Sequence, residues 1–359
     1  MTGKRRETRR LIQISAMSAM QTFMASKGNP EQYLSIHYLR GLAALMVVAV
    51  HCFTYGLVPV AQLSSVLWLK HGVALFFVIS GFVMVTSTQG RRTDPRNFLL
   101  RRLVRIAPLY WAMTLAWSMV QQGWDGRQLA ASLAFVPSLD PASGSVRSPV
   151  LEPGWTLNFE MFFYVIFALG LFLPERFRFW SVAAALVLIT QAGTVIDLPP
   201  LAAFYTDGLL LLFVVGMAIA RFDLRLPALW MAPAFIALIL FSDSLPIWQG
   251  VFVPVTVIVL AARSLDGRLP RWRLPAMLGD ASYSLYLSHL FVLQFGKIFI
   301  APYLPGPLVF ALMIAGACVL ALLVYRTVEV PASAWGRSRL THRTKVAVEQ
   351  APEPGPVPS

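Results

Sequence analysis

Long apolar runs constrain the fold of this chain more than any other feature of its sequence. A helix needs about 20 apolar residues to cross a hydrocarbon core of about 30 Å. Because 57% of the residues are hydrophobic and only 13% are charged, most of the chain is expected to lie in lipid. We predict an all-α fold, a polytopic membrane helical bundle of about ten transmembrane helices. The predicted spans are 38–57, 72–90, 106–121, 155–173, 179–196, 204–220, 227–242, 246–262, 279–300 and 305–325.

The basic residues predict the orientation of this bundle. With the N-terminus inside, four of the 30 Lys and Arg residues face outside, namely Lys70, Arg127, Arg147 and Lys297. The positive-inside rule therefore favours ten spans with both termini in the cytoplasm. Topology also explains the net charge of +13, and no nucleic-acid-binding motif accompanies it, so no nucleic-acid partner is expected.

Composition divides the chain into three parts. Residues 1–32 form a basic extension, predicted to be cytoplasmic, and residues 33–331 form the transmembrane domain. Residues 332–359 form a tail that is first basic and then rich in proline, which predicts disorder. Both cysteines, Cys52 and Cys318, lie in apolar runs without metal-ligand spacing, so no metal site is predicted.

Two ionisable residues share the first predicted span. Arg40 and His51 are eleven residues apart, which is three helical turns plus about 20° and a rise of about 16 Å. They should therefore lie on one helix face, with Arg40 near the inner boundary and His51 near the midplane. An ionisable residue inside the membrane is by default a functional hypothesis. The alternative, an interfacial anchor and a buried hydrogen-bond partner, stays open.

A cluster of arginines precedes the third predicted span. Arg102 and Arg105 form an R-x-x-R pair with side chains on one side of a helix, and Arg101 lies beside them. The arginine fork suits phosphate oxygens, so the cluster predicts a phosphate clamp on the cytoplasmic side. These residues also fit the simpler role of orientation anchors.

Further polar residues interrupt other spans. Glu160 lies about 9 Å below the outer boundary of the fourth span, where a carboxylate needs a partner or water. His289 falls at the level of His51 in the ninth span, close to Tyr283 on an unusually polar helix. Ser80 and Gly81 form a small notch in the second span. Close helix packing is the better interpretation for Gly81, and Ser80 is a candidate cavity donor.

Several of these stretches, in this order, carry a resemblance to a known family. They are R-x10-H in the first span, "FFVISGF" in the second, "RRLVRIAPLYW", "WTLNFEMFFY", "SYSLYLSH" and the closing "VEVP". Over residues 33–331 the chain resembles the acyltransferase-3 family of integral membrane acyltransferases, and especially bacterial exopolysaccharide O-acetyltransferases of the succinoglycan type.

The resemblance implies an activity and roles for the residues named above. The expected enzyme takes acetyl from cytoplasmic acetyl-CoA, without a metal or prosthetic group, and gives it to a sugar hydroxyl. The acceptor is a cell-surface or exopolysaccharide sugar, or its lipid-linked precursor, at the bacterial inner membrane. The implied catalytic residues are His51, as base or acyl carrier, with Arg40 and Glu160. The implied acyl-CoA ligands are Arg102, Arg105 and Arg101, and the candidate substrate-lining residues are Ser80, Tyr283 and His289.

One departure and two other functions stay open. Many relatives have an acidic residue where this chain has Ala74, so any role of that acid is absent or filled by another residue, such as Glu160. A transporter of polysaccharide intermediates, or a proton-coupled carrier, could relay protons through His51, Glu160 and His289. A scaffold for a polysaccharide synthesis complex is the third class. Membrane lipid surrounds the bundle in each case, and the sequence leaves a homo-oligomer open.

Overall fold

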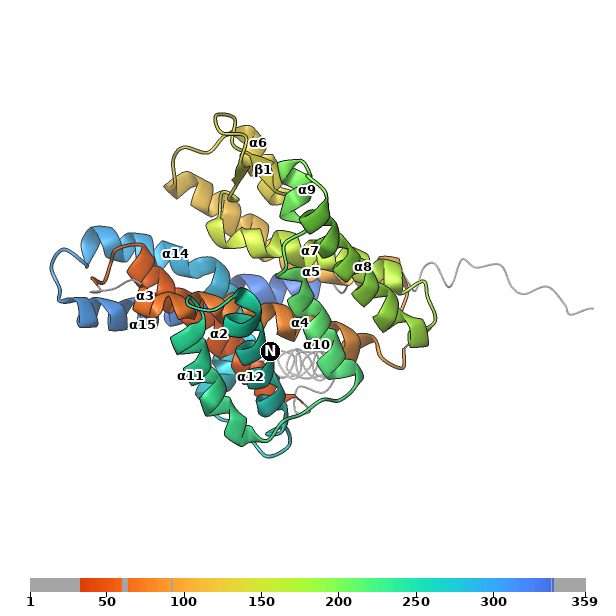
Figure 1. Cartoon of the computed structure of the whole chain (residues 1–359). Coiled ribbons are helices and arrows are strands. Elements are labelled where there is room, and N and C mark those ends of the chain that lie inside the picture. Colours follow the sequence, from red (N-terminus) through yellow and green to blue (C-terminus); the bar gives the residue numbers. More distant parts are fainter. Residues whose placement is uncertain (1–32, 60–63, 92, 337, 339–359) are drawn as a thin grey trace, which may run out of the picture. The chain divides into compact units, whose positions relative to one another are not determined.

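The described part of the chain is mainly helical. The computed structural model describes residues 33–59, 64–91, 93–336 and 338 (Figure 1). Within them, the only strands are β1 (Ser138–Leu139) and β2 (Val146–Arg147), which form one short antiparallel pair. The all-α prediction is therefore confirmed, and each of the ten predicted runs overlaps a helix.

The predicted ends of the chain fall largely outside this description. The extension 1–32 lies outside the described residues, as do residue 337 and the range 339–359 of the predicted tail. Residues 332–336, which the sequence analysis places in the tail, continue the last helix.

Five stretches of helix among the described residues are long and apolar enough to cross a membrane. They are Leu34–Thr54, Ser64–Thr88, Pro95–Val120, Glu175–Val195 and Gly306–Gly336. Three shorter apolar helices cover Leu210–Arg221, Ala228–Phe241 and Trp248–Arg263. The other two predicted runs form α7 (Trp155–Gly170) and α14 (Ser282–Phe299), which carry polar residues of the candidate site.

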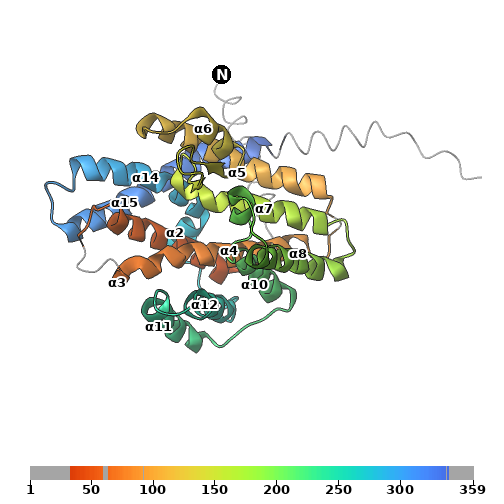
Figure 2. The ribbon, with the colours of Figure 1, turned by 45° about the horizontal axis from the view of Figure 1, so that its top comes forward.

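The helices group into two compact units, and the boundary between the units falls within α2 (Leu34–Thr54) after Val47. The first unit contains the start of α2 and the described parts of 62–91 and 211–280. Within it, α11 and α12 lie side by side (Figures 1 and 2). Its other elements are α3 (Ser64–Leu67), η1 (Trp68–His71), α4 (Gly72–Thr88), α10 (Leu210–Arg221), η3 (Ala228–Trp230), α11 (Met231–Phe241), η4 (Trp248–Phe252), α12 (Val253–Arg263) and α13 (Arg273–Asp280).

Glycines let two helices of this unit pack backbone to backbone. A Cβ atom on Gly81 of α4 would lie 2.1 Å from the carbonyl oxygen of Phe213 in α10. A Cβ atom on Gly216 of α10 would lie 1.9 Å from the carbonyl oxygen of Val78. Neither position tolerates a side chain without a backbone shift, so the close packing predicted for Gly81 is confirmed.

The first unit also buries an arginine that the orientation argument counted as an inner basic residue. Arg263 is 3% exposed, and it donates to Asp266 and, over 2.6 Å, to Oδ1 of Asp223. Its guanidinium lies 4.8 Å from the ring centroid of Tyr33 and 4.9 Å from that of Phe82. A buried charge needs such partners, so Arg263 holds segments of the unit together rather than meeting water.

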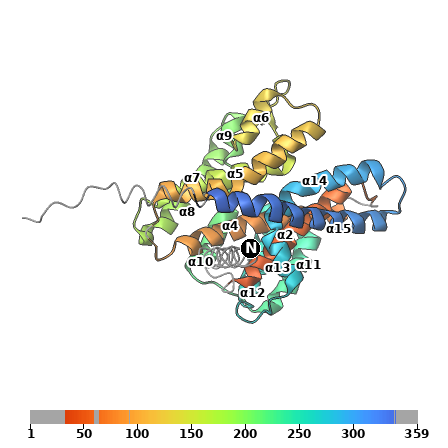
Figure 3. The ribbon, with the colours of Figure 1, turned by 180° about the vertical axis from the view of Figure 1, so that it is seen from behind.

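The second unit holds the end of α2 and the described parts of 92–210 and 281–338. In it α7 contacts both α5 and α8, and α14 lies along α15 (Figures 1 and 3). Besides α7, α14, β1 and β2, its elements are α5 (Pro95–Val120), α6 (Gly126–Leu133), η2 (Glu152–Gly154), α8 (Glu175–Val195), α9 (Pro200–Phe204), α15 (Gly306–Val324) and η5 (Tyr325–Glu329).

Helix α5 begins well before the predicted span at 106. Asp94 caps it by accepting a hydrogen bond from the Asn97 N–H over 2.8 Å, and Pro95 occupies the first helical position. Arg102 and Arg105 therefore lie on the helix itself, one turn apart on one side, which is the condition for a shared clamp.

Candidate active site

Two histidines that the sequence placed at one depth are in direct contact. His51 Nδ1 lies 2.7 Å from His289 Nε2, and the two rings stack with centroids 5.0 Å apart and planes 12° apart. His51 lies near the C-terminal end of α2, and its depth near the midplane of the membrane stays a prediction. Because α2 ends at Thr54 and the chain turns at Gly56, with φ of +72°, His51 lies in the last helical turn.

The hydrogen bonds assign the tautomer of each ring. His289 Nδ1 lies 3.2 Å from the carbonyl oxygen of Leu285, so this nitrogen carries a proton and donates it. Since His289 is fully buried and burial disfavours an imidazolium, its Nε2 has a lone pair that accepts from the His51 Nδ1–H. In a neutral His51 ring, Nε2 is then the nitrogen without a proton, which is the form that a base or nucleophile needs.

Two residues that sequence reasoning missed surround the histidine pair. The ring of Tyr55 packs edge-on against His51 with centroids 5.6 Å apart, and its hydroxyl donates to Glu152 Oε2 over 2.5 Å. The Tyr55 hydroxyl is the donor in this contact, because an ionised carboxylate can only accept. The i, i+4 spacing of His51 and Tyr55 could have identified Tyr55 as a neighbour of the histidine. No pattern near Glu152 in the sequence pointed to that residue.

The segment carrying Glu152 is tied to the helix of His289. The Tyr286 hydroxyl donates to the Pro153 carbonyl over 3.1 Å and lies 2.9 Å from Thr156 Oγ1. The Tyr286 ring in turn lies 6.4 Å from the His289 ring. These buried contacts fix the position of η2 relative to α14, and therefore the position of Glu152 relative to the histidine pair.

The predicted arginine clamp and the predicted glutamate form a second cluster. Arg102 is half-buried, with its guanidinium 5.4 Å from the ring centroid of Phe98 and 5.7 Å from that of Tyr164. Tyr164 donates to Glu160 Oε1, and both Arg105 and Glu160 interact electrostatically with Arg102. Glu160 therefore has Tyr164 and Arg102 as the partners that a carboxylate at this depth was expected to need. The early start of α5 brings Arg102 far enough along the bundle to reach α7.

The remaining predicted residues divide between the two units. Tyr283 donates to the Ile106 carbonyl over 2.8 Å, which places it against α5. Arg101, on the same helix α5, is exposed. Arg40 and Ser80 are half-buried in the first unit. In the described ranges, no three His, Cys, Asp or Glu residues are arranged to hold a metal ion.

A buried amide lies in the first turn of α7. Asn158 is 1% exposed, and neither Oδ1 nor Nδ2 has a hydrogen-bond partner among the described residues. It follows Gly154 by one turn, and a Cβ atom on Gly154 would lie 2.5 Å from the Tyr110 hydroxyl of α5. Buried polar atoms are normally paired, so a substrate amide is a fitting partner for this side chain.

Comparison with known proteins identifies the family. The family described as "Acyltransferase domain" (Acyl_transf_3) matches residues 33–326. The chain is 34% identical over 290 residues to "Exopolysaccharide production protein ExoZ" of Rhizobium meliloti (strain 1021), covering 75% of this chain and 90% of that protein.

A second relative carries an acyltransferase name. The chain is 26% identical over 339 residues to "Acyltransferase MdmB" of Streptomyces mycarofaciens, covering 80% of this chain and 86% of that protein. No solved structure matches the chain significantly. Because the family match spans nearly all of the described helices, the protein belongs to the acyltransferase-3 family and is a multi-pass membrane acyltransferase.

Proposed function

We propose that the protein is an O-acetyltransferase that moves acetyl from cytoplasmic acetyl-CoA to a sugar hydroxyl. The proposed acceptor is an exopolysaccharide or cell-surface glycan, or its lipid-linked precursor. The 2.7 Å contact between His51 Nδ1 and His289 Nε2 is the observation that carries the proposal, because it leaves Nε2 of a neutral His51 ring available as a base. The name of the exopolysaccharide production relative supports the acceptor class, and that of the other relative supports acyl transfer.

The proposed topology has ten spans in the bacterial inner membrane, with both termini in the cytoplasm. The distribution of Lys and Arg supports this topology. Under it, only Lys70, Arg127, Arg147 and Lys297 face outside, as the positive-inside rule favours. In this arrangement the N-terminal end of α5, with its arginines, faces the acetyl-CoA pool. The segment between α5 and α7, which includes Glu152, faces the opposite side.

The proposed reaction uses His51 Nε2 as general base. This nitrogen takes the proton of the sugar hydroxyl as the hydroxyl oxygen attacks the thioester carbonyl. The C–S bond then breaks, and the protonated ring returns the proton to the CoA sulfur. In the alternative, Nε2 itself attacks the thioester carbonyl, the C–S bond breaks and CoA leaves as its thiolate. The ring then carries the acetyl group until a sugar hydroxyl takes it and the ring nitrogen is released. Both routes need the same nitrogen to be free of a proton.

The donor is proposed to bind along α5 and α7. Arg102 and Arg105 are placed to hold the CoA phosphates, with Arg101 assisting from an exposed position. Asn158 has an unpaired buried amide, and such a group suits the amides of the pantetheine arm. Glu160 and Tyr164 orient Arg102 through their shared hydrogen bond and charge.

Acetyl transfer in proteoliposomes tests this function. The full chain, given radiolabelled acetyl-CoA and a de-acetylated bacterial exopolysaccharide, is expected to release CoA and to place label on the glycan. Mapping of the protein at short times separates the two routes, because only the carrier route labels His51. The proposal is wrong if acetyl-CoA is not consumed and no glycan is labelled by a protein whose helical content, measured by circular dichroism, is intact.

Loss of the arginine pair is expected to weaken donor binding. Changing Arg102 and Arg105 together to Ala should raise the KM for acetyl-CoA on the order of 10–100-fold, because charged hydrogen bonds to phosphate are lost. Lys at both positions keeps the charge but not the fork, so an intermediate KM is expected. Arg176→Ala on α8 is the matched control, and its KM for acetyl-CoA should not change. An unchanged KM in the double variant would show that Arg102 and Arg105 only orient the chain in the membrane.

A further inference from the structure

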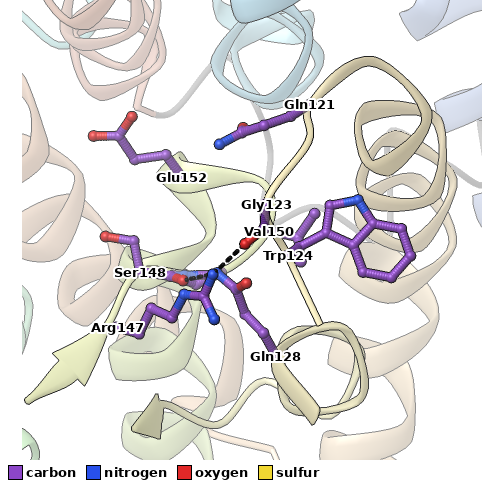
Figure 4. Close-up of a pocket in the computed structure, with 9 residues that line it drawn as sticks. Gln121, Gly123, Trp124, Gln128, Arg147, Ser148, Val150 and Glu152 are labelled. Carbon is purple, nitrogen blue, oxygen red and sulfur yellow. Dashed lines mark hydrogen bonds between the residues drawn. The ribbon is translucent and has the colours of Figure 1, made fainter. Parts of the chain in front are cut away.

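A polar pocket opens beside the candidate active site within the second unit. It has a volume of about 370 Å³ and is formed by the end of α5, the start of α6 and the segment leading to α7. Figure 4 shows Gln121 and Glu152 at one end of the pocket, and Arg147 and Gln128 at the other. Its lining residues are Gln121, Gly123, Trp124, Gln128, Arg147, Ser148, Pro149, Val150 and Glu152.

Hydrogen bonds hold the walls of this pocket in place. Arg147 pairs with Asp125 over 3.0 Å and donates to the Gly123 carbonyl over 2.5 Å, and Gln128 Nε2 donates to the Ser148 carbonyl over 2.7 Å. The Gln128 N–H, with help from Arg147, holds the pKa of Asp125 below its ordinary value, so the ion pair persists at neutral pH. The pocket is therefore formed before any ligand arrives.

The lining suits a sugar ring. Gln121 accepts from the Trp117 indole through Oε1, which leaves its amide N–H groups for a ligand. Trp124 is 36% exposed and its indole N–H is engaged by the Ser118 carbonyl, so its ring face remains for stacking. The Glu152 carboxylate accepts a hydrogen bond from the Tyr55 hydroxyl through Oε2. Its other oxygen, Oε1, can accept a hydrogen bond from a sugar hydroxyl.

The charges in the pocket select among sugars. The positive charge of Arg147 is matched by Asp125, so the carboxylate of Glu152 is the unbalanced charge that a ligand meets. A uronate or other acidic sugar would be repelled, and an uncharged pyranose with free hydroxyls would not.

The pocket is connected to the histidine pair. Glu152 accepts from the Tyr55 hydroxyl, Tyr55 packs on His51, and the Glu152 carboxylate interacts electrostatically with His51. We propose that this pocket binds an uncharged pyranose unit of the acceptor glycan and directs one of its hydroxyls toward His51. This inference rests on the proposed acetyl transfer, and it adds the acceptor site and the acceptor class.

Acceptor kinetics with two pocket variants test the inference. Trp124→Ala and Glu152→Gln should each raise the KM for a neutral gluco-oligosaccharide acceptor by about 10-fold or more, because stacking or a charged hydrogen bond is lost. The KM for acetyl-CoA should not change. For the unaltered protein, a uronate oligosaccharide of the same length should have a higher KM than the neutral oligosaccharide. In Glu152→Gln, the KM values of the two acceptors should lie closer together.

Controls and a binding measurement separate the inference from the proposed function. Trp180→Ala and Glu175→Gln, both on α8, are the matched controls. Binding of the neutral oligosaccharide without acetyl-CoA, followed by saturation-transfer NMR, should be lost in Trp124→Ala and kept in Trp180→Ala. Normal transfer and normal acceptor KM in both pocket variants overturn the acceptor site alone. Absence of transfer by the unaltered protein, despite oligosaccharide binding, overturns the proposed function instead.

Discussion

His51→Ala is expected to lower kcat/KM for acetyl transfer on the order of 10²–10⁴-fold, the usual contribution of a positioned base. The physical reason is the lone pair on Nε2, which no neighbouring group can supply in its place. The Tyr55 hydroxyl acts as a donor, and the Glu152 carboxylate is already engaged by that hydroxyl. The measurement is radiolabelled acetyl transfer in proteoliposomes, normalised to the amount of inserted protein.

Thr54→Ala is the matched control for this variant. Thr54 is exposed in the same helical turn, and its hydroxyl donates to the Val50 carbonyl of its own helix over 3.2 Å. Its removal leaves the histidine pair untouched, so activity should persist. Transfer at the unaltered rate by a correctly inserted His51→Ala protein would remove this ring from the mechanism.

His289→Leu is expected to lower kcat by about 10²-fold, because the ring of His51 then loses the partner that fixes its tautomer. Leu fills the buried site and adds no polar atom of its own, and half-buried His51 can turn its Nδ1–H to water, so the fold should survive. His289→Gln offers an amide oxygen near the position of Nε2 and should keep most of the activity, since it still accepts from His51 Nδ1–H.

The comparison of these two variants distinguishes a positioning role from a packing role. Thermal unfolding in detergent should give similar midpoints for both proteins, whereas kcat should differ between them. The KM for acetyl-CoA should stay the same, because His289 is fully buried. Equal activity of His289→Leu and His289→Gln would show that hydrogen bonding by this residue does not matter for the reaction.

Local patterns predicted much of this protein. The apolar runs gave helices at all ten places, because a membrane helix is a property of one continuous segment. Depth along each helix put His51 and His289 at one level, and the structure shows that the two rings are in contact. The start of α5 was missed, even though Asp94 and Pro95 are ordinary signals for a helix N-terminus.

The missed parts of the site depend on contacts between distant segments. Glu152 meets Tyr55 across 97 positions of sequence, and Tyr286 meets Thr156 across 130. No spacing rule connects such residues, because their proximity depends on how η2 packs on α14. Glu160 was placed by its depth in one helix, but its partner Arg102 lies on α5, whose start the apolar run did not show.

The tautomer of His51 is the most direct test of the account. ¹⁵N NMR of the full chain in bilayers, with labelled histidine and His51→Ala for assignment, reports which ring nitrogen carries the proton. The structure predicts a neutral ring with the proton on Nδ1 and none on Nε2. A proton on Nε2 in the resting protein would contradict the proposed base.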